Sequence, residues 1–192
     1  MKKIAIIGAG ISGLFFANLL NDNTDCDFTI FEKRSTIETN DGYGIQLSVN
    51  SIRLLNQIGF KNINQNEIYN PKKIIFINSK NKQKICDLDI SKFNYEDSKY
   101  TTLKRSTLIK FLLKNIPKEK IKLNSELINF TQAEKLTLSF SKKFTENFDY
   151  LIVSDGVFSK TKSIILKKNI RPKYFKSVAV RGNLRNYPNE DI

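Results

Sequence analysis

Three glycines near the start of the chain most constrain its fold. They stand at positions 8, 10 and 13, after a short apolar run, Ile4–Ile7, and before a longer run with helical spacing, Leu14–Leu20. A second short apolar run, Phe28–Phe31, follows and ends at the acidic residue Glu32. Strand, glycine-rich turn, helix, strand and acid in this order predict a βαβ unit with parallel strands.

The spacing of this turn indicates a dinucleotide-binding site. Gly8 permits a tight strand-to-helix turn, Gly10 has no Cβ to keep a pyrophosphate away, and Gly13 allows the helix and strand to pack closely. The free N–H groups at the helix N-terminus, with Ser12 in the first turn, complete the expected pyrophosphate site. Glu32 would bind the two hydroxyls of an adenosine ribose. A glycine-rich turn with a purely structural role is the alternative.

The composition excludes some functions and argues against others. The 192 residues include no histidine, which excludes histidine-based catalysis and histidine-ligated metal sites. The net charge of +13 comes with abundant lysine but with no nucleic-acid-binding motif. No segment approaches the ~20 apolar residues of a membrane helix, and glycines interrupt the one run that resembles a secretory signal. We therefore expect a cytoplasmic protein without metal or nucleic acid, in which Cys26 and Cys86 are free thiols.

Later segments predict a helix, a hairpin and several short elements. Residues 50–59 carry apolar side chains at helical spacing and end on Gly59, a typical C-cap. Ile74–Ile77 and Lys84–Leu88 flank a polar turn and predict a β-hairpin. The other predicted elements are strands at 120–123, 127–130 and 136–140 and a helix at 159–166.

Arg105 and Asp155 are further candidates for ligand binding. Ser106 is the expected N-cap of a helix, so Arg105 lies at a helix start, where the dipole disfavours a cation unless an anion binds there. Phe148–Val153 predicts a buried strand, and Asp155 with Gly156 follows it, where open α/β sheets bind ligands. An ordinary surface arginine and a simple Asp-Gly turn are the alternatives.

Four separated blocks together resemble the N-terminal half of flavin-dependent aromatic monooxygenases of the para-hydroxybenzoate hydroxylase type. Residues 8–34 resemble the FAD-binding start of that family, and residues 44–59 its second block, with Val49 where proline is usual. Arg105 resembles the family's arginine that contacts the flavin cofactor. Residues 149–159 resemble its aspartate-glycine motif, which serves both FAD and NAD(P)H. Lys162 replaces the arginine that usually follows, and residues 179–182 resemble a strand of the substrate domain.

The resemblance implies an α/β fold, with a Rossmann-like three-layer FAD-binding domain at 1–69 and 99–168 and part of a β-rich substrate domain at 70–98 and 169–192. It implies FAD as cofactor, NADH or NADPH as reductant, and hydroxylation of a small aromatic substrate. It identifies no catalytic residue. Lys33 and Arg34 would lie beside the adenine, Leu127 would contact it through its backbone, and Asp155 and Gly156 would lie near the pyrophosphate. The expected cofactor-binding residues are Gly8, Gly10, Ser12, Gly13, Glu32, Lys33, Arg34, Arg105, Leu127, Asp155 and Gly156.

The chain stops at Ile192, before the glycine-aspartate motif that binds the ribitol in longer family members. We therefore expect weak FAD binding and poor catalysis, with self-association or a partner chain at an unpaired sheet edge. Whether the chain itself is an enzyme stays open. The alternatives are an NAD-dependent dehydrogenase with the same βαβ unit, a related flavin oxidoreductase such as a quinone-ring hydroxylase, and a truncated or split, non-catalytic nucleotide-binding half.

Overall fold

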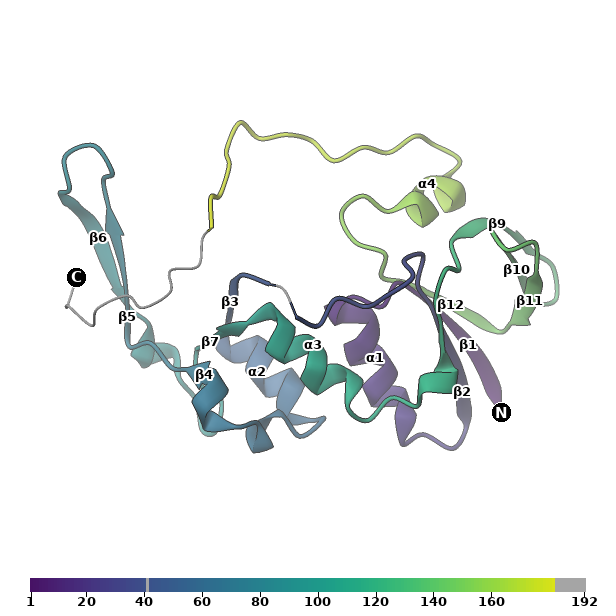
Figure 1. Cartoon of the computed structure of the whole chain (residues 1–192), viewed down its shortest axis with the longest axis horizontal. Coiled ribbons are helices and arrows are strands. Elements are labelled where there is room, and N and C mark those ends of the chain that lie inside the picture. Colours follow the sequence, from purple (N-terminus) through teal and green to yellow (C-terminus); the bar gives the residue numbers. More distant parts are fainter. Residues whose placement is uncertain (41, 182–192) are drawn as a thin grey trace.

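The computed structural model describes residues 1–40 and 42–181 (Figure 1). A parallel sheet with the strand order β12-β1-β2-β8 forms its centre. Its strands are β1 (Lys2–Ile7), β2 (Cys26–Phe31), β8 (Ile121–Lys122) and β12 (Tyr150–Val153). The helix α1 (Ile11–Asn21) connects β1 to β2. The predicted βαβ unit is therefore confirmed.

The parallel sheet separates two apolar cores. The helix α1 packs on one face, and α3 (Arg105–Leu113) and α2 (Val49–Asn56) extend the same core. An antiparallel sheet of β9 (Leu127–Gln132), β10 (Leu136–Phe140) and β11 (Thr145–Phe148) packs on the other (Figure 1).

Side chains of β1 alternate between these two cores, because successive residues of a strand point to opposite faces. Ile4 and Ile6 face the helices, whereas Ala5 and Ile7 face the antiparallel sheet. Near the second core, Phe31 stacks on Phe140 with ring centroids 4.1 Å apart. The predicted three-layer α/β fold is therefore confirmed.

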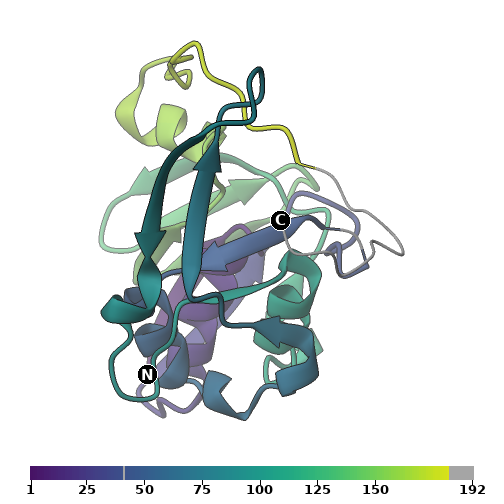
Figure 2. The ribbon, with the colours of Figure 1, turned by 90° about the vertical axis from the view of Figure 1, so that its left-hand side faces the viewer.

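Residues 44–104 form two further antiparallel sheets. One consists of β3 (Gly44–Leu47), β7 (Thr101–Lys104) and β4 (Ile68–Tyr69). The other is the predicted hairpin of β5 (Lys73–Ile77) and β6 (Lys84–Asp89), which extends away from the parallel sheet (Figures 1 and 2). Short 3₁₀ helices lie at Phe60–Asn62, Gln65–Glu67, Ile90–Phe93 and Lys118–Lys120. The proposed domain boundaries near residues 70, 98 and 168 stay a prediction.

Two local predictions are wrong. Helix α3 begins at Arg105 with Lys104 as its N-cap, so Ser106 is a buried residue of the first turn and caps nothing. Residues 148–153 are not one buried strand, because Phe148 ends β11 and β12 begins at Tyr150. As the edge strand of the parallel sheet, β12 has a neighbour on one side only within residues 1–40 and 42–181, and its Tyr150 is half exposed.

The C-terminal part of the described chain begins with a helix. As predicted, α4 (Lys160–Leu166) starts after Ser159, whose hydroxyl accepts a hydrogen bond from the Lys162 N–H. Residues 179–181 form no strand, and Gly182 lies outside the described residues, as does the rest of the predicted substrate-domain segment up to 192. None of the described helices is long and apolar enough to cross a membrane.

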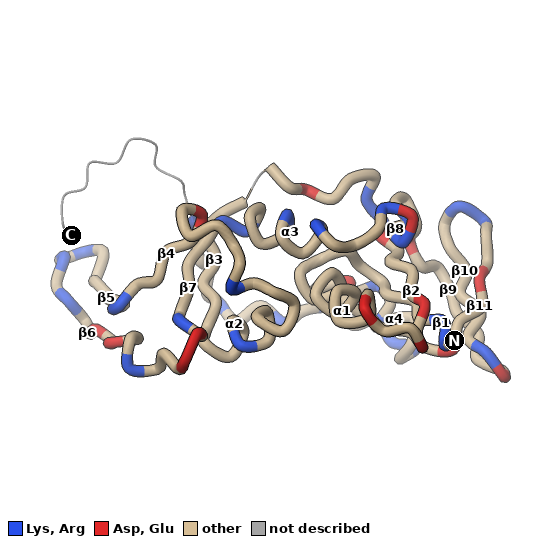
Figure 3. Tube along the Cα trace, turned by 90° about the horizontal axis from the view of Figure 1, so that it is seen from below, with Lys and Arg blue, Asp and Glu red and all other residues tan. Residues whose placement is uncertain are grey.

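Lysine and arginine positions are distributed along the whole trace, from the β5–β6 hairpin to the β10–β11 turn (Figure 3). Negative residues lie among them, and several form ion pairs, such as Lys84 with Asp87 at 3.1 Å. The positive charge is therefore not gathered in one segment of the described chain.

Asp149 joins β12 to β1 and makes stability depend on pH. Its carboxylate accepts a hydrogen bond from the Lys3 N–H at 2.8 Å, and this bond lowers the pKa of Asp149. A carboxyl whose folded pKa is lowered stabilises the fold above its unfolded pKa of about 3.9, and this contribution is lost as the pH falls through the folded pKa. We expect Asp149→Asn to flatten the fall in unfolding free energy below about pH 5.

Urea unfolding followed between pH 7 and the acid range measures this effect. Glu134→Gln, in the exposed turn between β9 and β10, is the control and should keep the wild-type pH profile. An unchanged acid slope in Asp149→Asn would show that this carboxylate contributes nothing to the pH dependence.

Candidate functional site

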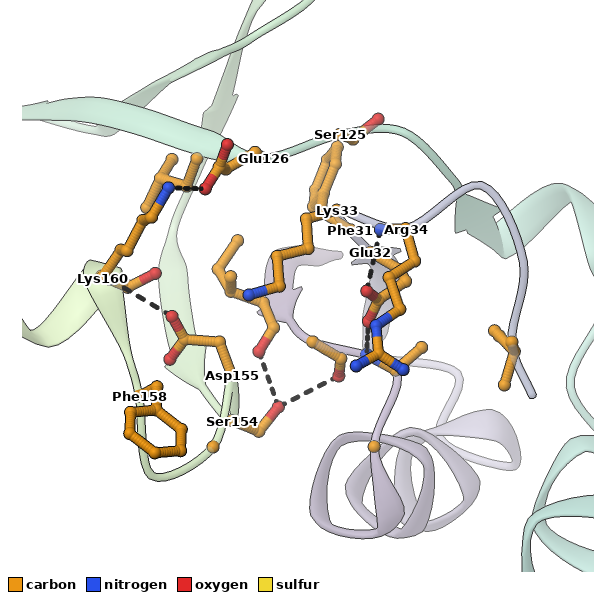
Figure 4. Close-up of a pocket in the computed structure, with 18 of the residues that line it drawn as sticks. Phe31, Glu32, Lys33, Arg34, Ser125, Glu126, Ser154, Asp155, Phe158 and Lys160 are labelled. Atoms are coloured by element: carbon orange, nitrogen blue, oxygen red, sulfur yellow. Dashed lines mark hydrogen bonds and ion pairs between the residues drawn. The ribbon is translucent and has the colours of Figure 1, made fainter. Parts of the chain in front are cut away.

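A cavity of about 350 Å³ opens where β1, β2 and β12 end (Figure 4). Because these strands are parallel, their carboxyl ends meet at one edge of the sheet, the usual ligand-binding position of open α/β folds. The volume lies in the range of small-molecule and cofactor sites. Most of the predicted residues line it, namely Gly8, Gly10, Glu32, Lys33, Arg34, Arg105, Leu127, Asp155 and Gly156.

The reason for the absence of a side chain differs among the three glycines of the turn. Gly8 has φ +101°, which side chains rarely adopt, and a Cβ there would lie 2.6 Å from the Ser154 carbonyl oxygen. A Cβ on Gly13 would lie 2.1 Å from the Gly8 carbonyl oxygen. A Cβ on Gly10 would meet nothing within 4 Å, although Gly10 lines the cavity. Only at Gly10, therefore, does the missing side chain leave room for a ligand rather than for the protein itself.

Ser12 and Gly13 do not line the cavity. Ser12 is exposed in the first turn of α1, and Gly13 is buried under the turn. Gly13 thus acts through packing, as predicted, whereas a direct contact of Ser12 with a pyrophosphate stays a prediction.

The Glu32 carboxylate is held next to the glycine turn. Its Oε2 accepts a hydrogen bond from the Ala9 N–H and its Oε1 accepts one from the Arg34 N–H, both at 2.9 Å (Figure 4). Each carboxylate oxygen can accept two hydrogen bonds. Both oxygens therefore keep an acceptor position for a hydroxyl, which suits the adjacent hydroxyls of a ribose.

The hydrogen bonding of the Asp155 carboxylate is incomplete in the protein alone. Its Oδ2 accepts a hydrogen bond from the Thr161 N–H at 3.2 Å. Its Oδ1 is buried and has no hydrogen-bond partner among residues 1–40 and 42–181. A buried acceptor without a donor is costly. A hydroxyl of a bound cofactor, or an ordered water molecule, would satisfy it, so the residues present fit a polyhydroxylated ligand.

Positive side chains approach the cavity from separate elements. Lys33 and Arg34 follow β2, and in Figure 4 Lys33 extends between Glu32 and Asp155. Arg105 comes from the start of α3, where its N–H donates to the Tyr43 carbonyl. These cations favour an anionic ligand such as a phosphate. In the part of the chain that the structure describes, no cluster of acidic and cysteine side chains could hold a metal ion.

Several cavity residues were missed by sequence reasoning. The Ser154 hydroxyl donates to the Ile7 carbonyl at 2.8 Å, with the Gly8 carbonyl at 3.2 Å, and so ties β12 to the turn. The Lys160 ammonium pairs with the Glu126 carboxylate at 2.7 Å, which links α4 to the start of β9. Ser154 adjoins the predicted Asp155, but nothing in the sequence relates Glu126 to Lys160.

Comparisons with known proteins agree with this geometry. A model of the NAD(P)-binding Rossmann-like domain family matches residues 6–50. Monooxygenase asqM of Emericella nidulans is 26% identical over 211 residues, covering 98% of this chain and 46% of the relative. FAD-dependent monooxygenase dpchE of Colletotrichum higginsianum is 28% identical over 171 residues, covering 84% of this chain and 35% of the relative. The chain thus spans less than half the length of these curated relatives.

A solved structure extends the comparison to the fold. HpxO of Klebsiella pneumoniae, in complex with FAD and uric acid, superimposes with a TM-score of 0.73 at 19% identity. The match covers 88% of this chain and 42% of HpxO. The resemblance visible in the sequence motifs is confirmed: the chain is similar in sequence to part of FAD-dependent monooxygenases, and in fold to part of HpxO.

Proposed function

We propose that the chain binds FAD through its ADP half and forms the cofactor-binding part of an NAD(P)H-dependent monooxygenase for an aromatic or similar small ring. The observation that carries this proposal is the meeting of the glycine turn, the Glu32 carboxylate and the unpaired Asp155 Oδ1 in one cavity lined by cations.

Each part of the cofactor has a counterpart in the cavity. The open backbone at Gly10 suits the pyrophosphate, because an N–H-rich helix start without a side chain allows close approach. Glu32 suits the adenosine ribose, and the base would lie beside Lys33 and Leu127. Arg105, from α3, would lie on the flavin side.

The bound flavin would supply the redox and oxygen chemistry, as cofactors generally do. The residues of this chain would bind and orient it. A ring substrate is supported by two similar proteins, HpxO in its complex with uric acid and the 3-amino-4-hydroxybenzoate 2-monooxygenase PtnB3 of Streptomyces platensis. The reductant, NADH or NADPH, belongs to the proposal through the family resemblance.

Glu32→Ala tests the ribose assignment. The change removes two charge-assisted hydrogen bonds to the ribose, each worth roughly 1.5–3 kcal/mol. We expect ADP to bind more weakly by at least about 100-fold, as measured by isothermal titration calorimetry. Glu32→Gln, which keeps one acceptor oxygen, should bind with intermediate affinity.

Loss of the Glu32 carboxylate could also weaken ADP binding by loosening the glycine turn. An ADP analogue without the two ribose hydroxyls is the control for this effect. The analogue should bind wild type and Glu32→Ala with equal affinity, because it lacks the two hydroxyls that the Glu32 carboxylate would bind. The ribose assignment is wrong if ADP affinity is unchanged in Glu32→Ala, or if the analogue loses as much affinity as ADP.

A further inference from the structure

The Glu126–Lys160 ion pair lies at one end of the cavity and belongs to none of the motifs. Lys160 is the first residue of α4, and its ammonium donates to Glu126 Oε1 at 2.7 Å. Both side chains line the cavity (Figure 4). The side chain of Lys160 is 70% exposed and that of Glu126 is 30% exposed. Such an exposed pair contributes little to stability, so the fold does not depend on it.

Backbone contacts place this pair next to the proposed ribose site. The Ser125 N–H donates to the Glu32 carbonyl at 2.8 Å, so the segment that carries Glu126 adjoins Glu32 directly. The segment is also held from the other side, where the Ser141 N–H donates to the Glu126 carbonyl at 2.9 Å. The glycine turn would hold the phosphates on one side of the ribose. The base on the other side of that ribose would therefore meet Glu126 and Lys160.

The pair offers a hydrogen-bond acceptor beside a donor. Glu126 Oε1 is engaged by Lys160, whereas Oε2 has no hydrogen-bond partner within the described part of the chain. The Lys160 ammonium has three donor hydrogens, of which one is used. Adenine presents an amino donor beside ring-nitrogen acceptors, but guanine presents a carbonyl acceptor at the same position, and hypoxanthine shares that carbonyl. A carboxylate facing a carbonyl is repulsive, because neither oxygen can donate a hydrogen bond to the other.

We propose that Glu126 and Lys160 read the six-position edge of the purine and select adenine over hypoxanthine and guanine. This inference rests on the proposed binding of FAD through its ADP half. Glu126 accepts from the amino group, and Lys160 both orients the Glu126 carboxylate and donates to a ring nitrogen. The two residues thereby add base specificity to a site whose ribose and phosphate contacts would accept any nucleotide.

ADP and inosine diphosphate test the proposal, because they differ only along the six-position edge, in the amino or carbonyl group and in the hydrogen that hypoxanthine carries on N1. We expect wild type to bind ADP roughly tenfold or more tightly than inosine diphosphate in equilibrium titrations. Glu126→Gln should bring the two affinities close together, because an amide can turn either its oxygen or its NH₂ toward the base. Lys160→Met changes the other residue of the ion pair and should also reduce the ratio of the two affinities. It serves as the second variant should Glu126→Gln fold poorly.

Glu146→Gln is the matched control. Glu146 pairs with Lys122 between β11 and β8, outside the cavity lining, so the ratio of the two affinities should stay at its wild-type value. Equal binding of the two nucleotides by wild type, or an unchanged ratio in both cavity variants, overturns the inference and leaves the proposed FAD binding intact. Absence of ADP binding by wild type would overturn the proposed function and this inference with it.

Discussion

Gly10→Val is expected to abolish binding of ADP and FAD while the protein stays folded. The backbone at Gly10 is extended, with φ −83° and ψ −177°, a conformation that valine adopts readily. A Cβ there meets no atom of the described residues within 4 Å, so the free protein accommodates it. The added side chain instead occupies the space through which a pyrophosphate would approach the turn. Loss of two or more charge-assisted hydrogen bonds to phosphate would weaken binding by more than about 100-fold.

Titration calorimetry with ADP and quenching of FAD fluorescence measure this effect, and urea unfolding measures the stability. The unfolding free energy should stay within about 0.5 kcal/mol of wild type, as for other surface changes. Gly10→Ala, with a smaller side chain, should bind with intermediate affinity. Wild-type ADP affinity in Gly10→Val would mean that no phosphate approaches this turn.

Gly13→Ala is expected to destabilise the fold by about 3 kcal/mol or more, as severe overpacking does. The added Cβ would lie 2.1 Å from the Gly8 carbonyl oxygen and 2.7 Å from the Ser154 hydroxyl oxygen. Both the turn and the end of β12 would have to shift, because the first of these atoms belongs to the backbone. The propensity of the helix works in the opposite direction, since alanine is favoured over glycine inside a helix by about 1 kcal/mol.

Urea unfolding followed by far-UV circular dichroism compares Gly13→Ala with Gly10→Ala. The two changes add the same methyl group three residues apart, so the difference between them reports the contact with Gly8 and Ser154, less the gain in helix propensity at Gly13. A stability of Gly13→Ala equal to or above wild type would show that helix propensity outweighs this contact, and that α1 does not pack against the turn as described.

Local patterns were sufficient to predict the elements around the site. The apolar runs and glycines of residues 4–31 predict the βαβ unit, because a strand, a tight turn and a helix each leave a short-range signature. The β5–β6 hairpin and the helix α4 follow for the same reason. The N-cap at Ser106 was wrong, because a serine in this position can cap a helix or be buried in its first turn, and only the path of β7 into α3 decides between them.

Contacts between distant segments could not be predicted in this way. Residues 148–153 are apolar enough for a central strand, but β12 is at the edge of the sheet, because among the described residues it pairs with β1 alone. The Ser154 hydroxyl becomes a tie between β12 and the turn only once these strands are adjacent. Glu126 and Lys160 likewise meet only because α4 folds back beside β9.

The amino-acid sequence alone therefore specified the phosphate-binding turn, its acid at Glu32 and the three-layer class of fold, since these depend on residue type and spacing over a few tens of residues. Only the tertiary structure decided which side chains share the cavity with them. It brought Arg105, Glu126 and Asp155 to one edge of the parallel sheet and left Ser12 outside the cavity. The physical reason is that strand order and helix packing minimise exposed apolar surface across the whole chain, and no local pattern records that balance.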